Sequence, residues 1–269
     1  MELDEFCLRL GMEQTAADLC CAFAPDLQTT HAALRLLRAR PQAFAEKMRP
    51  KTPAEKLALA ADMARQLEDV YSRWGISPRI YWDTFEDIAL WEREFFDRTG
   101  EHGLTEFDWI CRHLDMRLFR LGSLQFEPLA SLPAAAAGLR LEEGELLLNV
   151  HIPKGADLSE AARRDSFAQA LEFWSCSSAV CLCDSWLLGP ELQNLLPAGS
   201  RIKQFAAEFA ILSTNPESPQ AVQRIFGQAD PAAFLEKGSS LQRAAARHLA
   251  AGCCLSSACG WKRIESGSV

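Results

Sequence analysis

The sequence lacks the features that would assign it to a membrane or to nucleic acid. It contains no run of about twenty apolar residues, the length that a membrane-spanning helix needs, and it opens MELDE, without the basic flank of a signal peptide. Residues 1–116 hold 14 basic and 21 acidic side chains, and residues 117–269 hold 14 and 15. Neither part has a basic excess that would attract nucleic acid or an anionic membrane. We therefore expect a cytoplasmic protein that binds neither.

The ten cysteines also lack the spacing of a zinc site, because no C-x-x-C pair occurs among them. Cysteines that lie close together in the sequence have other spacings. Cys20 and Cys21 are adjacent, as are Cys253 and Cys254, and one residue separates Cys181 from Cys183. Cytosol keeps thiols reduced, and a reduced cysteine behaves as a small hydrophobic residue. We expect no metal and a mainly structural role for the cysteines.

The first part of the chain has the period of helices. Apolar residues recur at spacings of three and four across five segments, residues 3–10, 29–40, 53–74, 84–98 and 105–114. Residues 76–82 could form a short strand, which Pro78 would restrict to a sheet edge. This pattern predicts a helical N-terminal domain over residues 1–116.

From residue 117 the pattern alternates between strands and helices. Strands are expected at residues 119–126, 140–152, 180–186 and 202–213, with a further one near 252–264, and helices at 159–174, 190–196, 220–226 and 241–251. Two strands precede the first of these helices and resemble an adjacent antiparallel pair, so the order indicates a mixed sheet rather than a purely parallel one. The fold class is α+β, with a sheet flanked by helices over residues 117–269.

Polar residues lie near the ends of two of these strands. His151 could accept a proton, because a free imidazole has a pKa near neutrality; alternatively it bonds loop backbone and fixes the strand end. Asp184 and Ser185 could act as a base and a hydroxyl, or Asp184 could cap the following turn. Hydrolysis by a Ser-His-Asp triad is disfavoured, because no G-x-S-x-G motif occurs.

Several strings resemble a known family. LGSLQFE at 121–127, NVHIP at 149–153 and CDSWLL at 183–188, with Phe205 and Phe209, are similar to a bacterial family of acyltransferase-domain proteins. That family joins a helical N-acyltransferase N-terminal domain to a GNAT-like C-terminal domain. The resemblance implies an N-acyltransferase that moves the acyl group of acyl-CoA or acetyl-CoA to an unidentified amine, either a small molecule or a peptide.

The resemblance also implies a pyrophosphate-binding loop over residues 153–159, with Lys154, Gly155 and the amides at Ser159 facing the cofactor. Two departures stand out. The loop has one glycine instead of two and carries Asp157 where an anion would approach. Many GNAT enzymes use a tyrosine to protonate the leaving thiolate, but the only tyrosines are Tyr71 and Tyr81. Ser185, Cys183 or a water would have to replace it.

Two other functions stay open. The first is a non-catalytic binding or regulatory protein that kept the fold after losing the phosphate loop. The second is a protein that binds a pantetheine-bearing partner such as an acyl carrier protein. That partner would need a basic patch around Arg163, Arg164 and Lys154. Alternatively, Arg163 and Arg164 could belong to a solvated helix face. The sequence does not indicate an oligomeric state.

Overall fold

A computed structural model describes residues 1–267 and divides the chain into two compact units, residues 1–121 and 122–269. The first unit is helical and the second holds most of a mixed β-sheet, which confirms the α+β fold class. The expected boundary between residues 116 and 117 stays a prediction. No helix in the described part of the chain is both long and apolar enough to cross a membrane.

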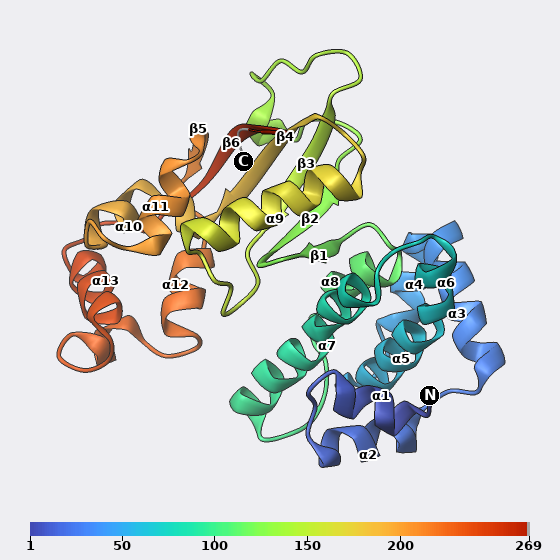
Figure 1. The fold of residues 1–269 in the computed structure, drawn as a ribbon. Coiled ribbons are helices and arrows are strands. Elements are labelled where there is room, and N and C mark those ends of the chain that lie inside the picture. The colour runs from blue at the N-terminus through green and yellow to red at the C-terminus, as the bar shows by residue number, and fades with distance from the viewer. Residues whose placement is uncertain (268–269) are drawn as a thin grey trace. The chain divides into compact units, whose positions relative to one another are not determined.

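The first unit contains eight helices and ends in a short strand (Figure 1). These are α1 Leu3–Arg9, α2 Gln14–Phe23, α3 Leu27–Ala39, α4 Pro41–Met48, α5 Pro53–Gln66, α6 Glu68–Arg73, α7 Pro78–Thr99, α8 Phe107–Leu114 and β1 Phe119–Leu121. The strand expected at residues 76–82 is wrong, because Pro78 is the first residue of α7 and Ser77 caps that helix through the Ile80 amide. Proline loses nothing at this position, where its missing N–H would have no helical partner.

Aromatic side chains and one buried carboxylate hold the first unit together. Tyr81 lies with its ring centroid 5.1 Å from those of both Tyr71 and Phe85. Asp87 on α7 accepts hydrogen bonds from Trp109 Nε1 at 2.7 Å and from His113 Nε2 at 3.0 Å, both on α8. Because Asp87 and His113 are buried, these bonds satisfy groups that would otherwise lose their water partners.

Within residues 122–267, the second unit contains most of the sheet and five α-helices. Its elements are β2 Leu124–Pro128, β3 Leu146–His151, α9 Glu160–Phe173, β4 Ser178–Ser185, α10 Pro190–Leu195, α11 Arg201–Ala207, β5 Ala210–Asn215, α12 Gln220–Phe226, α13 Ser240–Ala250 and β6 Ser257–Glu265, with 3₁₀ turns η1 Ala134–Ala136, η2 Trp186–Leu188 and η3 Pro231–Phe234. The strand order is β1-β2-β3-β4-β6-β5. Only β3 and β4 run parallel among the pairs from β2 to β6; the others are antiparallel.

Two strands are shorter in the structure than the sequence pattern predicts. Of residues 140–152 only Leu146–His151 form a strand, because 140–145 include a turn at Gly144 with a positive φ of 77°. Of residues 202–213 the first half is the helix α11, and the strand begins at Ala210. Phe205 and Phe209, four residues apart, pack against each other at 5.0 Å, which is a helical spacing.

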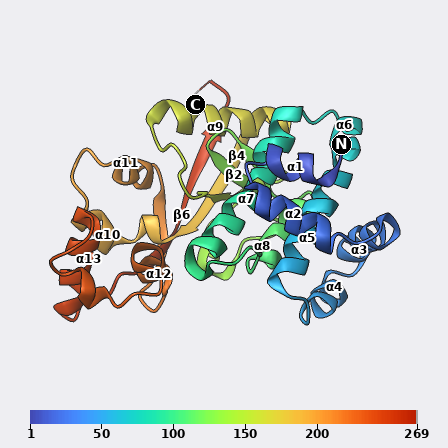
Figure 2. The same cartoon turned by 90° about the horizontal axis from the view of Figure 1, so that it is seen from below.

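The two faces of the sheet have different covers. Figures 1 and 2 show α9 running along one face, where Phe126 of β2 lies 5.8 Å from Phe167 of α9. The opposite face carries an apolar cluster that includes Leu147, Val180 and Leu182, packed with Ala136 of η1. Helices α10 to α13 gather at one end of the sheet, beside β5 and β6 (Figures 1 and 2).

The cysteines are all free, and six of the ten are buried. Burial raises the pKa of the Cys181 thiol to about 12, so this residue stays protonated and apolar. Among residues 1–267, no group of three His, Cys, Asp or Glu side chains is placed to hold a metal ion.

The Asp87 network gives a testable prediction for the first unit. Replacing Asp87 by alanine removes the buried carboxylate that binds Trp109 Nε1 and His113 Nε2, so the free energy of unfolding should fall by about 3 kcal/mol. Asp83→Ala is the matched control on the same helix, because Asp83 pairs with Arg79 at 3.5 Å near the surface and should cost less than about 0.5 kcal/mol. Urea unfolding followed by tryptophan fluorescence measures both, and equal midpoints for the two variants would contradict the role given to Asp87.

Candidate functional site

A row of polar side chains crosses one face of the sheet. Alternate residues of a strand share a face, and directly paired residues of neighbouring strands share it too. The pairings Gln125 with His151 and Glu127 with Asn149 therefore place all four side chains on the face opposite α9. Leu182 pairs with Asn149, so Asp184, two residues further along β4, lies on this face as well.

The central contact of this polar row joins a carboxylate to an imidazole. Glu127 Oε2 lies 3.5 Å from His151 Nε2 across the β2–β3 pair. The side chain of Glu127 is only 7% exposed and that of His151 17%. A carboxylate removed from water in this way favours a positive charge on its neighbour. The pair can accept a proton from a substrate and stabilise the resulting imidazolium.

The polar row lies where β3 and β4 stop pairing. In the described chain the parallel pairs run from Leu146–Ala179 to Asn149–Leu182, whereas β3 continues to His151 and β4 to Ser185. The carboxyl ends of adjacent parallel strands are the usual place for a ligand in α/β sheets. His151 therefore stands at the edge of the paired region, directly before the loop that leads to α9.

Asp184 and Ser185 have different surroundings. Asp184 is exposed at the end of β4, opposite Cys259 of β6. Ser185 is buried, and its Oγ accepts a hydrogen bond from the Leu187 amide at 3.1 Å, which starts the η2 turn. Cys183 alternates with Asp184 and so faces α9, where burial raises the pKa of its thiol.

The loop between β3 and α9 carries the expected cofactor-binding residues. Gly155 adopts a positive φ of 78°, and the Ala156 amide donates to the Pro153 carbonyl at 3.1 Å, so Lys154 and Gly155 form a tight turn. Ser159 caps α9 through its hydroxyl, which accepts from the Ala162 amide. The helix thus begins after Ser159, at Glu160.

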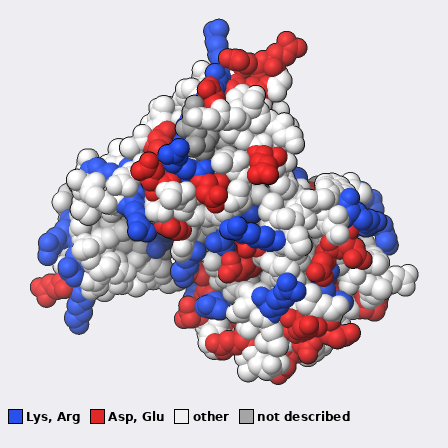
Figure 3. All heavy atoms as spheres, in the orientation of Figure 1, with Lys and Arg blue, Asp and Glu red and all other residues white. Residues whose placement is uncertain are grey.

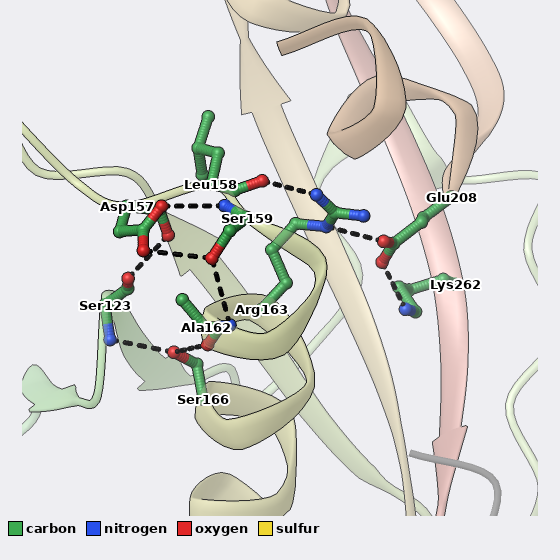
Figure 4. Close-up of polar contacts among 9 residues, drawn as sticks. All are labelled: Ser123, Asp157, Leu158, Ser159, Ala162, Arg163, Ser166, Glu208 and Lys262. Atoms are coloured by element: carbon green, nitrogen blue, oxygen red, sulfur yellow. Dashed lines mark hydrogen bonds and ion pairs between the residues drawn. The ribbon is translucent and has the colours of Figure 1, made fainter. Parts of the chain in front are cut away.

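Asp157 lies in the loop directly before the N-terminal end of α9. Its carboxylate accepts hydrogen bonds from the Ser159 amide and from the Ser159 hydroxyl, both at 2.9 Å (Figure 4). These two bonds, the backbone bond first, lower the pKa of Asp157 below its ordinary value of 3.8. Arg201 of α11 lies 3.0 Å from the same carboxylate. Asp157 is therefore ionised near neutral pH and is held by Ser159 and Arg201.

The turn before β2 is fastened to this loop and to α9. Ser123 donates its amide to Ser166 Oγ at 2.8 Å and its hydroxyl to the Asp157 carbonyl at 2.7 Å (Figure 4). Gly122 has a φ of 67°, and a side chain added there would meet Ser166 Oγ at 2.7 Å. Ser166 thus holds α9 to the turn before β2.

Arg163 is not a solvated residue of the helix face, contrary to that interpretation of the sequence. It is 4% exposed and donates to Glu208 at 2.6 Å and to the Leu158 carbonyl (Figure 4). Glu208 also binds Lys262 of β6 at 2.8 Å. Because a trans peptide directs its C=O and N–H to opposite sides, holding the Leu158 carbonyl turns the Ser159 amide outward, toward Asp157.

The basic patch expected for a carrier-protein partner is reduced by this arrangement. Arg163 is turned inward to Glu208, which leaves Arg164 and Lys154 as the exposed basic residues of the group. Figure 3 shows basic and acidic side chains interspersed over the visible face of the molecule.

Sequence reasoning missed Gln125 and Glu127 as site residues. Both lie on the short strand β2, on either side of the fully buried Phe126. Polar residues two apart on an otherwise apolar strand share one face, and that spacing was the available signal. Their pairing with His151 and Asn149 depends on the strand register, which the sequence does not show.

Family comparison agrees with the fold. The GNAT-like C-terminal domain matches residues 118–262, and the N-acyltransferase N-terminal domain matches residues 1–116. The chain therefore belongs to the family of proteins with a GNAT-like C-terminal domain, preceded here by an N-acyltransferase N-terminal domain. The resemblance noted in the sequence is confirmed. A search of curated proteins finds no match.

Solved structures of similar fold are acyltransferases. One, in complex with decanoyl-CoA and teicoplanin, is 23% identical with a TM-score of 0.77, over 97% of this chain and 87% of that one. Another, with CoA and 10C-teicoplanin, is 22% identical with a TM-score of 0.76, over 96% and 86%. A third, with decanoyl-CoA, is 19% identical with a TM-score of 0.60, over 98% and 99%. At these identities the likeness establishes a common fold.

The role of Arg163 can be tested by one pair of neighbouring substitutions. Arg163→Met leaves Glu208 and the Leu158 carbonyl without this partner in a buried setting, so the free energy of unfolding should fall by about 3 kcal/mol. Arg164→Met is the control, because Arg164 is exposed on the same helix, and it should change stability by less than about 0.5 kcal/mol. Thermal unfolding followed by circular dichroism compares the two variants. An unchanged transition temperature in Arg163→Met would contradict the stabilising role given to Arg163.

Proposed function

We propose that this protein is an acyl-CoA-dependent N-acyltransferase whose acceptor is a primary amine. The observation that carries the proposal is the Glu127–His151 pair, which stands directly before the loop that opens α9. Acyl transfer from coenzyme A to an amine requires a base that takes the amine proton and a site that binds the phosphates of the cofactor. A helix N-terminus can provide the second. Family membership supports the same reaction class.

In this proposal His151 accepts the proton of the attacking amine. The amine nitrogen forms a bond to the thioester carbonyl carbon, the C–S bond breaks, and the thiolate leaves with a proton from His151 or from water. Glu127 stabilises the imidazolium while it carries the proton. Asp184 is the alternative base and Ser185 a candidate acid, although its hydroxyl oxygen already accepts the Leu187 amide.

Lys154, Gly155 and Ser159 form the proposed pyrophosphate site. Gly155 allows the tight turn, the Ser159 amide and hydroxyl can donate to a phosphate oxygen, and Lys154 supplies a positive charge. Asp157 must release the Ser159 amide before a phosphate can take it, and Arg201 is placed to retain the displaced carboxylate. The similar structures hold decanoyl-CoA, so a medium-chain acyl-CoA is the first probe to use.

The setting of the reaction is also part of the proposal. Ten free cysteines are typical of a reducing compartment, which supports a bacterial cytoplasm. We assign residues 1–116 to a helical domain and residues 117–269 to the acyltransferase domain. Teicoplanin in two of the similar structures indicates an amine-bearing glycopeptide as one class of acceptor to test.

A non-catalytic binding function remains the second candidate, and Asp157 is the observation that favours it. Its carboxylate already satisfies the Ser159 amide, so the loop is complete without a ligand. Such a protein would bind no acyl-CoA, whereas the enzyme would bind it in competition with Asp157.

Substitution of His151 tests the proposed base. His151→Gln removes the base while leaving a polar neighbour for Glu127, so the turnover of decanoyl-CoA with an amine acceptor should fall at least tenfold. The free energy of unfolding should stay within about 1 kcal/mol of the original. Thiol release, followed with a chromogenic disulfide, measures turnover. Undiminished turnover in a folded variant would exclude His151 as the base.

Substitution of Asp157 tests the competition at the loop. Asp157→Asn removes a negative charge from the helix end, so coenzyme A should bind about two- to fivefold more tightly, and the gain should shrink in high salt. Because the pKa of Asp157 is lowered, the carboxylate stays ionised between pH 5 and 8 and the gain should be constant there. Asp165→Asn, one turn into α9, is the control. Calorimetric titration measures both, and weaker binding by Asp157→Asn would contradict the competition.

A further inference from the structure

Gln125 is a buried amide with an unused donor. Its side chain is 1% exposed, and Nε2 has no hydrogen-bond partner among residues 1–267. A buried donor without an acceptor destabilises a fold, so such groups are rare and call for an explanation. Leucine or methionine would fill the same position without that cost, and the neighbours Leu124 and Phe126 are both apolar and fully buried.

The location of this donor indicates a use for it. Gln125 pairs directly with His151 across the β2–β3 ladder, so the two side chains stand next to each other on the same face. Glu127, two residues further along β2, lies diagonally across from His151, and its carboxylate approaches the imidazole at 3.5 Å. The polar row thus holds a proton acceptor flanked by an anion and by an unpartnered neutral donor.

We propose that Gln125 Nε2 donates a hydrogen bond to the carbonyl oxygen of the acyl thioester and makes Gln125 a catalytic residue. The inference rests on the proposed function. When the amine nitrogen bonds to the carbonyl carbon, the π electron pair of the C=O bond moves onto oxygen and the amine proton passes to His151. When the carbonyl re-forms, the C–S bond breaks, and the thiolate takes up a proton.

A neutral donor suits this oxygen for electrostatic reasons. The negative charge on the oxygen exists only in the tetrahedral intermediate, and a donor already fixed in a water-poor setting stabilises it without reorganising. A lysine there would pair with Glu127 and neutralise the carboxylate that His151 needs. An amide keeps the charge of the Glu127–His151 pair intact and still supplies the N–H group.

Gln125→Met tests the assignment, because it removes the donor and keeps the approximate size of the side chain. Removal of one such donor should lower kcat for decanoyl-CoA with teicoplanin as acceptor about a hundredfold, while KM for decanoyl-CoA changes less than about threefold. The melting temperature should stay the same or rise, since no hydrogen bond is lost. Gln169→Met on α9 is the control: it removes the bond from Gln169 Nε2 to Asp165 and should keep kcat.

A spectroscopic measurement separates this inference from the proposed function. Infrared difference spectra of decanoyl-CoA labelled with ¹³C at the thioester carbonyl report the hydrogen bond without turnover. The carbonyl band of the bound thioester should lie at lower frequency in the original protein than in Gln125→Met. Equal frequencies in both, with decanoyl-CoA bound, would overturn the role of Gln125 and leave the transferase proposal intact. No binding of decanoyl-CoA to the original protein would overturn both.

Discussion

The register between β2 and β3 is the constraint on which the candidate site depends. Pairing Gln125 with His151 and Glu127 with Asn149 gathers four polar side chains on the face opposite α9. A shift of one residue would turn Gln125 and Glu127 into the α9 interface, where Phe126 now meets Phe167. The large apolar ring therefore fixes the register, and the register in turn brings the carboxylate within 3.5 Å of the imidazole. Packing on one face of the sheet determines chemistry on the other.

A second set of contacts connects the loop before α9 to the rest of the second unit. Arg163 holds the Leu158 carbonyl and Glu208, Lys262 secures Glu208 from β6, and Ser123 reaches the loop from the turn before β2. The loop is thus held in a defined shape without a ligand. Its one carboxylate, Asp157, already accepts the Ser159 amide, which is the donor that the proposed pyrophosphate site would use.

The sequence was sufficient for the fold class and for the neighbourhood of the site. Helical periods, the change of pattern after residue 116, and the positions of His151 and the loop were all readable from it. The partners of these residues were not. Glu127 is separated from His151 by 24 positions, and Arg163 looked like part of a solvated helix face because its acceptor, Glu208, lies 45 residues away. Likewise Phe205 and Phe209 suited an alternating strand as well as a helix, and only tertiary packing decides between them.

The proposed acyl transfer requires that this chain bind acyl-CoA and react at its thioester. Calorimetric titration of the full-length protein with acetyl-CoA, octanoyl-CoA and decanoyl-CoA, with desulfo-CoA as the thiol-free control, tests it most directly. We expect saturable binding of at least one acyl-CoA, and binding of desulfo-CoA through the same proposed phosphate loop. Absence of heat from all four ligands at millimolar concentration would contradict the account and favour the non-catalytic protein.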